Sequence, residues 1–482
     1  MQYLSRDYTI NLNVFRSDFQ DCSDFLLQEI TVSGGRAFLC VMDGLVDSLQ
    51  LAKAVTVPLQ HCVLEEDDGD ARLDALRQTV IAAPEMNTAN TFDDCYFFLM
   101  SGFAVLVTED CATALAVGVQ GWNSRMTEEP SNESNVKGAK ECFVESLNDN
   151  KALLRKRLKT PRLKFRQLQL GTAMQTPVVL AYLEGTADSR TVQMTEERLK
   201  SFSLPTVQDY GCLEPYLNVG VYSLFSRVGN TERPDVFASK LLEGRIGVMV
   251  EGTPFVLYTP YLFTDNFSSL DDYDNPPFYA SFIRLLKYFS FAISVLLPAL
   301  YVAIGAFHQE VIPTALLYII ASSEATTPFS LMTEAILIHL LYEIMREGGL
   351  RLPKSIGHAV SIIGAIVIGE AMVSAGLIGE PMLVVVALTA LASYVVYPLY
   401  ETVAVIRLGL IVIAGMTGIY GLSLAVIALT VNICALGTGG VPYMIPLSPF
   451  RAENAGDTLL RKSWLAGKQR VTMKSFEVDD SE

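Results

Sequence analysis

The chain of 482 residues lacks the residue patterns on which most catalytic and metal-binding sites are built. It has four histidines and contains no GxSxG, Walker A, HExxH or dinucleotide-binding fingerprint. Its eight cysteines are scattered without a CxxC pair, so no ligand spacing supports a zinc site, and we expect no disulfide scaffold. We therefore expect a protein that is not an enzyme, binds no metal or cofactor, and keeps its cysteines as reduced, mostly buried thiols.

Charge is scarce in one long part of the sequence. Residues 288–450 contain four Lys or Arg and eight acids, all Glu, whereas residues 1–287 contain 26 Lys or Arg and 38 Asp or Glu. The net charge of −16 and the hydrophobic fraction of 50% therefore belong mainly to different parts, an acidic soluble part and a following membrane part. This division excludes a purely cytosolic enzyme, and the lack of a concentrated basic face argues against binding to nucleic acid.

The soluble part repeats a pattern of strand, acidic turn and helix. An apolar run at 36–42 ends at Asp43-Gly44, and a similar run ends at Glu184-Gly185, 141 residues later. Two hairpin patterns, at 102–117 and 244–259, recur at an offset of 142 residues. The nearly equal offsets predict two tandem α/β units of one topology, with chance similarity between generic strands as the alternative.

The predicted fold is therefore an α/β N-terminal region of two tandem, similar subdomains, followed by an α-helical multi-pass membrane bundle. A polar, charge-rich stretch separates the two units and suits a connecting helix, and a segment rich in Asp, Ser, Asn and Pro (260–277) links the second unit to the membrane part. The predicted boundaries are 1–124 and 166–275 for the subdomains, 125–165 for the connecting helical segment, 284–450 for the transmembrane domain and 451–482 for a cytoplasmic tail.

Several apolar segments reach or approach the length needed to cross a bilayer. Three are predicted as spans: 288–307, with Pro298 as a helix kink, 357–378 and 382–400. The stretches 311–322 and 328–346 together predict one broken crossing or a re-entrant pair. The last segment, 408–436, is long for one span, and Gly415, Gly418 and Gly421 could divide it into two halves.

The distribution of basic residues predicts the orientation. The first residues show no apolar segment of a signal peptide, so we expect the N-terminal domains to face the cytoplasm. Basic residues cluster near 284–287, near 346–354, at Arg407 and in the tail. Placing all four clusters inside favours about six membrane segments, and the tail ends outside if 408–436 crosses once.

Ionisable residues at membrane depth are the candidate functional residues, because a charge in hydrocarbon costs at least roughly 2.5–3.5 kcal/mol on insertion scales. Glu370 lies inside the 357–378 span. It could line a cation pathway or relay protons, or it could be a packing residue hydrogen-bonded to Ser374. His339 and Glu343 share a helix face, with Glu334 nearly opposite Glu343.

Glu334, His339 and Glu343 could line a pore, or they could belong to an interfacial amphipathic helix. We interpret Glu401 and Arg407 as ordinary anchors at the cytoplasmic end of a span. Small residues at Ser361, Ala365 and Gly369 allow close helix packing, within the bundle or between copies.

Short motifs occur in order along most of the chain. They include DGLVD at 43–47, EEP at 128–130, NKALLR at 150–155, TERPD at 231–235, GTP at 252–254, LPALY at 297–301, IPT at 312–314, RLP at 351–353 and GVPY at 440–443. In this order they resemble the A subunits of spore germinant receptors, the GerA family of spore-forming Firmicutes. The run KGAKECF at 137–143 departs from the family's RGPREGF, and the family commonly has an uncharged amide where Glu370 stands.

The resemblance implies a multi-pass subunit of the spore inner membrane whose N-terminal domains face the spore core. Such a subunit would assemble with the receptor's B and C subunits, the B subunit being the usual place for nutrient binding. It would also assemble with itself into an ion channel that opens when nutrient binds and starts cation release. The alternatives are an accessory channel subunit like the stage V sporulation protein AF, a secondary transporter, or a structural scaffold for the B and C subunits.

Overall fold

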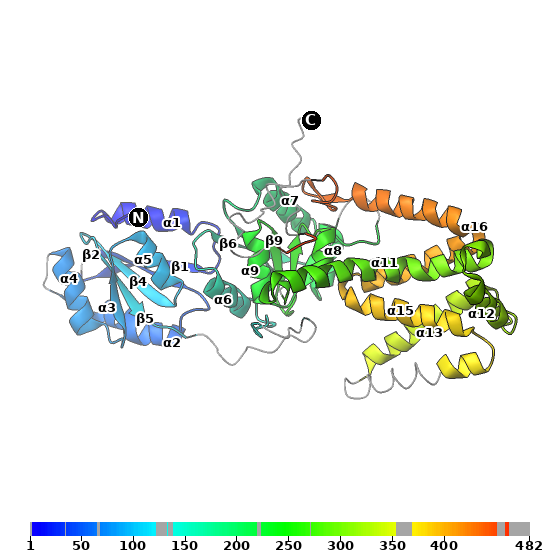
Figure 1. The fold of residues 1–482 in the computed structure, drawn as a ribbon. Coiled ribbons are helices and arrows are strands. Elements are labelled where there is room, and N and C mark those ends of the chain that lie inside the picture. Colours follow the sequence, from blue (N-terminus) through cyan, green and yellow to red (C-terminus); the bar gives the residue numbers. More distant parts are fainter. Residues whose placement is uncertain are drawn as a thin grey trace.

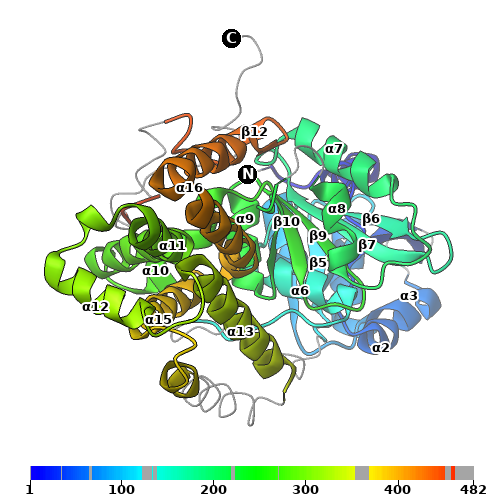
Figure 2. The same ribbon diagram turned by 90° about the vertical axis from the view of Figure 1, so that its right-hand side faces the viewer.

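The protein is elongated, with its sheets toward one end and a group of long helices at the other (Figure 1). The computed structural model describes residues 2–33, 35–64, 68–121, 133, 138–218, 223–269, 271–352, 369–450 and 458–461. Seen from the helical end, α11, α12, α13, α15 and α16 lie together beside the sheet that contains β9 and β10 (Figure 2).

The first unit is an antiparallel five-stranded sheet in the order β1-β2-β4-β5-β3, covered by helices on both faces. Its strands are β1 (Phe25–Val32), β2 (Gly35–Met42), β3 (Met86–Ala89), β4 (Phe103–Thr108) and β5 (Ala114–Gly118). Its helices are α1 (Tyr8–Asp18), α2 (Ser48–Leu51), α3 (Val57–His61), α4 (Gly69–Ala75) and α5 (Phe92–Leu99), with π-helical turns at Ala52–Thr56 and Leu76–Val80. Alternate residues of β2 face α1 and α5 on one side and α3 and α4 on the other, which explains its continuous apolar run.

The second unit has the corresponding strand order, β6-β7-β9-β10-β8, and is also antiparallel. Its strands are β6 (Leu163–Leu170), β7 (Thr176–Leu183), β8 (Gly229–Thr231), β9 (Ile246–Val250) and β10 (Val256–Thr259). Its helices are α6 (Leu147–Arg157), α7 (Ser189–Lys200), α8 (Glu214–Leu217) and α9 (Pro234–Leu242), with a 3₁₀ turn at Tyr210–Cys212. One face of the sheet packs on α6 and α9 and the other on α7 and α8.

The repeated acidic turn has the same backbone in both units. Gly44 and Gly185 have φ of 80° and 78°, which glycine adopts without steric cost. Three residues later, Asp47 and Asp188 accept hydrogen bonds from backbone N–H groups at the start of α2 and α7. The structure confirms the strand predicted at 36–42 as β2 and the similar run that ends at Glu184-Gly185 as β7. It also confirms the two predicted hairpins, which are β4–β5 and β9–β10.

Two predicted connections are corrected by the structure. Of the described residues in 125–165, only α6 is helical, and 163–165 already belong to β6. The segment predicted as a linker is folded, with a 3₁₀ turn at Phe263–Phe267 and the short helix α10 (Asp271–Asp274). Its acidic residues are not solvated linker residues, because Asp265 pairs with Arg245 and Asp272 with Arg284, all of them buried or nearly so.

The helical part begins with α11 (Pro277–Phe307), which starts before the predicted boundary at 284. It continues with α12 (Thr314–Glu324), α13 (Leu331–Arg351), α15 (Glu380–Val395) and α16 (Tyr400–Ala435), with 3₁₀ turns at Gln309–Val311 and Tyr397–Leu399, and ends in the short strands β11 (Gly437–Thr438) and β12 (Val441–Pro442). The span predicted at 382–400 is too long, because α15 ends at Val395. Pro398 lacks an N–H and disfavours helical backbone at Tyr397.

Two helices in the described part of the chain are long and apolar enough to cross a membrane, Pro277–Phe307 and Tyr397–Ala435. The second is broken at Gly418, whose φ and ψ are 65° and −155°. The middle one of the three predicted glycines is therefore where the two halves of the 408–436 segment meet. The stretch 311–346 forms two separate helices, α12 and α13.

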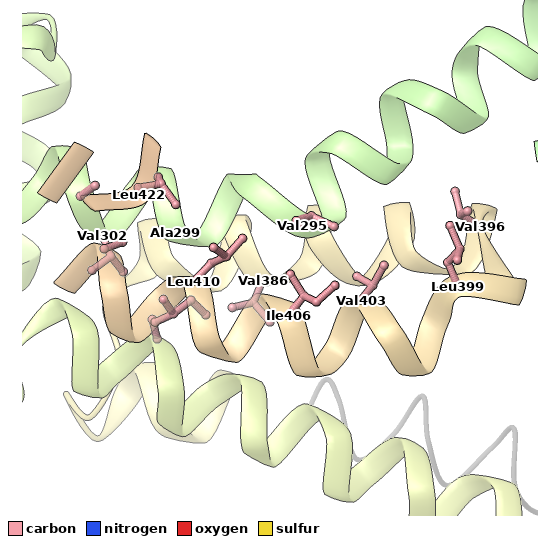
Figure 3. Close-up of a cluster of buried hydrophobic side chains, with 14 of the residues drawn as sticks. Val295, Ala299, Val302, Val386, Val396, Leu399, Val403, Ile406, Leu410 and Leu422 are labelled. Carbon is pink, nitrogen blue, oxygen red and sulfur yellow. The ribbon is translucent and has the colours of Figure 1, made fainter. Parts of the chain in front are cut away.

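Apolar side chains fill the space between the long helices. Figure 3 shows Val403, Ile406 and Leu410 of α16 lying toward α11, near Val295 and Ala299. All five side chains are buried. This core fixes α16 against α11 and sets the positions of the polar residues on the neighbouring helices.

Candidate functional site in the helical part

An ion pair between a buried arginine and a half-buried glutamate joins α13 to α16. Arg407 is 1% exposed, and its Nη2 donates to Oε1 of Glu343 at 2.8 Å. Its Nη1 donates to Oγ of Ser393 on α15 at 3.2 Å. One guanidinium therefore connects three helices of the apolar part, where an unpaired charge would be strongly unfavourable.

The Glu343 carboxylate has further partners. The hydroxyl of Tyr400 donates to it at 2.9 Å, and Nε of Arg346 lies 3.3 Å from its Oε2. The guanidinium of Arg346 also stacks over the Tyr400 ring, 3.7 Å from the ring centroid. Two cationic side chains and a hydroxyl thus surround a single carboxylate, so its negative charge is compensated in this conformation.

The structure separates the other predicted residues of α13. His339 is 1% exposed, and its Nδ1 lies 2.8 Å from the carbonyl oxygen of Ala335 one turn earlier. Glu334 is also 1% exposed, and its Oε1 accepts the backbone N–H of Gly379 at 2.6 Å. His339 and Glu334 are therefore buried residues inside the group of helices.

Glu370 does not join this cluster. Among the described residues it lies in the helical stretch 369–374, and its side chain is exposed. The Glu370 side chain makes no hydrogen bond or ion pair within the described ranges, including the one considered with Ser374. Its surroundings toward the N-terminus, residues 353–368, lie outside the described part.

The packing and kink residues are placed as follows. Ser361 and Ala365 lie outside the described residues. Gly369 is buried, and a Cβ added there would lie 3.5 Å from a methyl carbon of Leu383 on α15, an ordinary contact distance. Pro298 is buried inside α11, and the ribbon of α11 bends near Val295, one turn before it (Figure 3).

The sequence-based interpretation of Arg407 as an ordinary membrane anchor is wrong, because its guanidinium is buried and paired. One feature of the sequence could have indicated this burial. Arg407 lies seven residues inside an apolar helix, and no acidic residue four positions away in that helix could pair with it. A buried arginine requires a carboxylate, and Glu343 lies 64 positions earlier in sequence. In the residues that the structure covers, no group of three or more His, Cys, Asp and Glu is placed to hold a metal ion.

Comparisons with known proteins identify the family. Residues 13–473 match the family described as Bacillus/Clostridium GerA spore germination protein. The chain is similar to spore germination protein KA of Bacillus subtilis (strain 168), with 34% identity over 97% of this chain and 86% of that protein. It is also similar to spore germination protein GerLA of Bacillus cereus, with 32% identity over 90% of this chain and 89% of that protein.

A solved structure is similar to part of the chain. It is the N-terminal domain of the A subunit of the Bacillus megaterium spore germinant receptor GerK3, with a TM-score of 0.42 and 26% identity, covering 54% of this chain and 98% of that chain. The family match itself extends through both α/β units and the helical part. The chain belongs to the GerA family of spore germination proteins.

Proposed function

We propose that this protein is the A subunit of a nutrient germinant receptor in the spore inner membrane, and that several copies form a cation channel that opens when nutrient binds. The family match over residues 13–473 supports the receptor role. The observation that carries the channel role is the ion pair of the buried Arg407 with the half-buried Glu343 within apolar helices. Ionisable residues inside membrane-spanning segments are costly and rare, and many of them lie on ion pathways, proton relays or voltage sensors.

The arrangement of the pair corresponds to a closed state. A cation passing through the bundle needs oxygen ligands that are free of competing positive charge. Glu343 is held by Arg407 and Arg346 and accepts the Tyr400 hydroxyl, so its carboxylate offers no site for a cation. Separation of α13 from α16 would remove Arg407 and Tyr400 from the carboxylate and leave it beside Arg346 of its own helix, at 3.3 Å, so that a cation could approach it.

The remaining parts of the proposal follow the family and the charge distribution. The receptor's B and C subunits are the partners, the N-terminal domains face the spore core, and the helical part forms about six membrane segments in the bilayer. The shared strand order of the two sheets supports a duplication of one α/β unit. A secondary transporter is the alternative function, and the break of α16 at Gly418 favours it, since broken helices form many transporter sites.

The test is nutrient-triggered cation release from spores that lack all other germinant receptors. With the wild-type chain and its B and C subunits present, we expect the spores to release cations when nutrient is added. Spores without this chain, but with both partner subunits, should release no cations. Unchanged release from those spores would exclude the proposed role.

A further inference from the structure

The two arms of α16 meet at a single glycine. Gly418 has a backbone conformation that is essentially restricted to glycine, and it separates residues 400–417 from 419–435. Figure 1 shows the second arm, in orange, running back from the outer end of the bundle toward α7. At 1.5 Å per residue each arm is about 27 Å long, so a 10° change at the glycine would move an arm's far end by about 5 Å.

One short segment of the second α/β unit holds the far ends of both arms. We call residues 223–227 the clasp. The carbonyl oxygen of Leu224 accepts the hydroxyl of Thr402, at the start of the first arm, at 2.7 Å. The Ser223 hydroxyl donates to Oδ1 of Asn432, near the end of the second arm, at 3.0 Å.

A third contact lies directly beyond the second arm. Nη1 of Arg227 donates to the carbonyl oxygen of Gly437 at 3.0 Å. Arg227 is 4% exposed and is itself fixed in the second unit, because its Nη2 donates to the carbonyl oxygen of Asn218 at 2.7 Å. Through Arg227 the clasp is therefore fastened to the second unit.

The clasp also enters the core of the helical part. Phe225 is 2% exposed, and its ring centroid lies 6.1 Å from that of Phe263 and 6.4 Å from that of Tyr443. The apolar cluster around Phe225 includes Val403 of the first arm and Ile433 of the second. Both arms thus meet the second unit at one point, and they meet each other again at Gly418.

We propose that the clasp couples the second α/β unit to the angle between the arms of α16. A displacement of the arm ends by a few ångströms exceeds the reach of a hydrogen bond, so the arms cannot change their angle while all three clasp contacts persist. Movement of the second unit away from the bundle releases the arms, and its return closes them. This inference concerns the internal mechanics of the chain and holds whether or not the protein conducts ions.

The test measures the distance between the arms by double electron–electron resonance on the full chain in lipid nanodiscs. Nitroxide labels are placed through Val405→Cys and Ile427→Cys, two exposed positions on the first and second arm, after Cys62, Cys212 and Cys434 are replaced by Ser. We compare the unmodified clasp with the pair Ser223→Ala and Thr402→Val, alone and combined with Arg227→Ala.

The unmodified clasp should give one narrow distance distribution. The Ser223→Ala, Thr402→Val pair should add a second population at a distance longer by several ångströms, and Arg227→Ala should increase that population. Thr430→Val is the matched control, because its exposed hydroxyl bonds only within its own arm, to the carbonyl oxygen of Val426. Distributions of the clasp variants that superimpose on that of the unmodified chain would overturn the inference, and the small Ser223→Ala, Thr402→Val pair keeps the test valid if Arg227→Ala unfolds.

Discussion

The guanidinium of Arg407 lies 2.8 Å from the carboxylate of Glu343 and so joins α16 to α13 across 64 positions of sequence. Arg407 is buried by this contact whereas the Glu343 side chain stays 21% exposed, and Nε of Arg407 has no hydrogen-bond partner among the residues that the structure describes. The pair is therefore needed to compensate a buried charge, while its own bonding is incomplete. Such a contact can hold two helices together and still be separable.

Removing one charge of this pair should destabilise the helical part. We expect Glu343→Gln to lower the free energy of unfolding by about 3–5 kcal/mol, because it leaves Arg407 buried without a counter-charge. Glu347→Gln is the control, since Glu347 pairs with Arg351 at an exposed position and should cost about 0–1 kcal/mol. The effect of each variant is measured as the change in its thermal unfolding midpoint in detergent. Equal midpoints for Glu343→Gln and Glu347→Gln would contradict a structural role for the pair of Glu343 with Arg407.

A second buried pair joins the two α/β units. Nε of Arg155 on α6 donates to Asp24 at 2.7 Å, and both side chains are 1% exposed. Asp24→Asn should cost about 3–5 kcal/mol and loosen the contact between the units. Its matched control is Glu29→Gln, which breaks an exposed pair with Arg16 and should change stability by about 1 kcal/mol or less. Limited proteolysis of the full chain should show faster cleavage for the first variant alone.

The contribution of Asp265 to stability should depend on pH. Burial alone would raise the pKa of Asp265, but the charges of Arg245 and Lys240 and its hydrogen bonds outweigh this effect and hold the pKa well below its ordinary value. A carboxyl with a lowered pKa in the folded state stabilises the fold above its unfolded pKa of about 3.9, and this stabilisation is lost as the pH falls through the folded pKa.

Asp265→Asn should therefore be less stable than the wild type at pH 7, and the difference should shrink as the pH falls below about 4. The measurement is the unfolding midpoint of both chains between pH 7 and pH 3. A difference that stays constant over this range, or that grows in acid, would show that the charge of Asp265 does not stabilise the fold.

The turn glycines allow strain and crowding to be measured separately. A Cβ at Gly44 would lie 3.1 Å from the carbonyl oxygen of Asn148 and 3.3 Å from Cβ of Ala152, in addition to the strain of its positive φ. Gly252 has a similar φ of 89° but open space around it. Gly252→Ala should cost about 1–2 kcal/mol, and Gly44→Ala more. Equal costs, measured by chemical unfolding, would show that α6 does not pack closely on the turn.

The sequence predicted the α/β units better than the helical part, for a physical reason. Strands such as β2 and β7 are short, apolar and bounded by acid-Gly turns, so local pattern and backbone geometry agree. The nearly equal sequence separation of the two acidic turns and of the two hairpins then indicated that both units share one topology. The 3₁₀ turn around Asp265 was missed because its acidic residues look like a solvated linker unless their buried partners are known.

In the helical part, composition alone indicates where apolar helices lie and not which charged residues meet. Glu370 stood out because it interrupts an apolar run, yet it is exposed within the described ranges. Arg407 looked ordinary because it is near the start of an apolar segment, yet it is buried. The pairing of Arg407 with Glu343 depends on how α13 and α16 pack, which no local pattern in either helix encodes.

If Arg407 keeps the Glu343 carboxylate closed to cations, its removal should change the cation leak of growing cells, which can be followed as loss of membrane potential. Cells express the chain with the proposed B and C subunits at matched levels, without nutrient. The account predicts that Arg407→Gln raises the leak above that of the wild type, that adding Glu343→Gln to it abolishes the increase, and that the exposed control Arg351→Gln has no effect. A leak that is the same in all four cases would show that Arg407 does not block a cation pathway at Glu343.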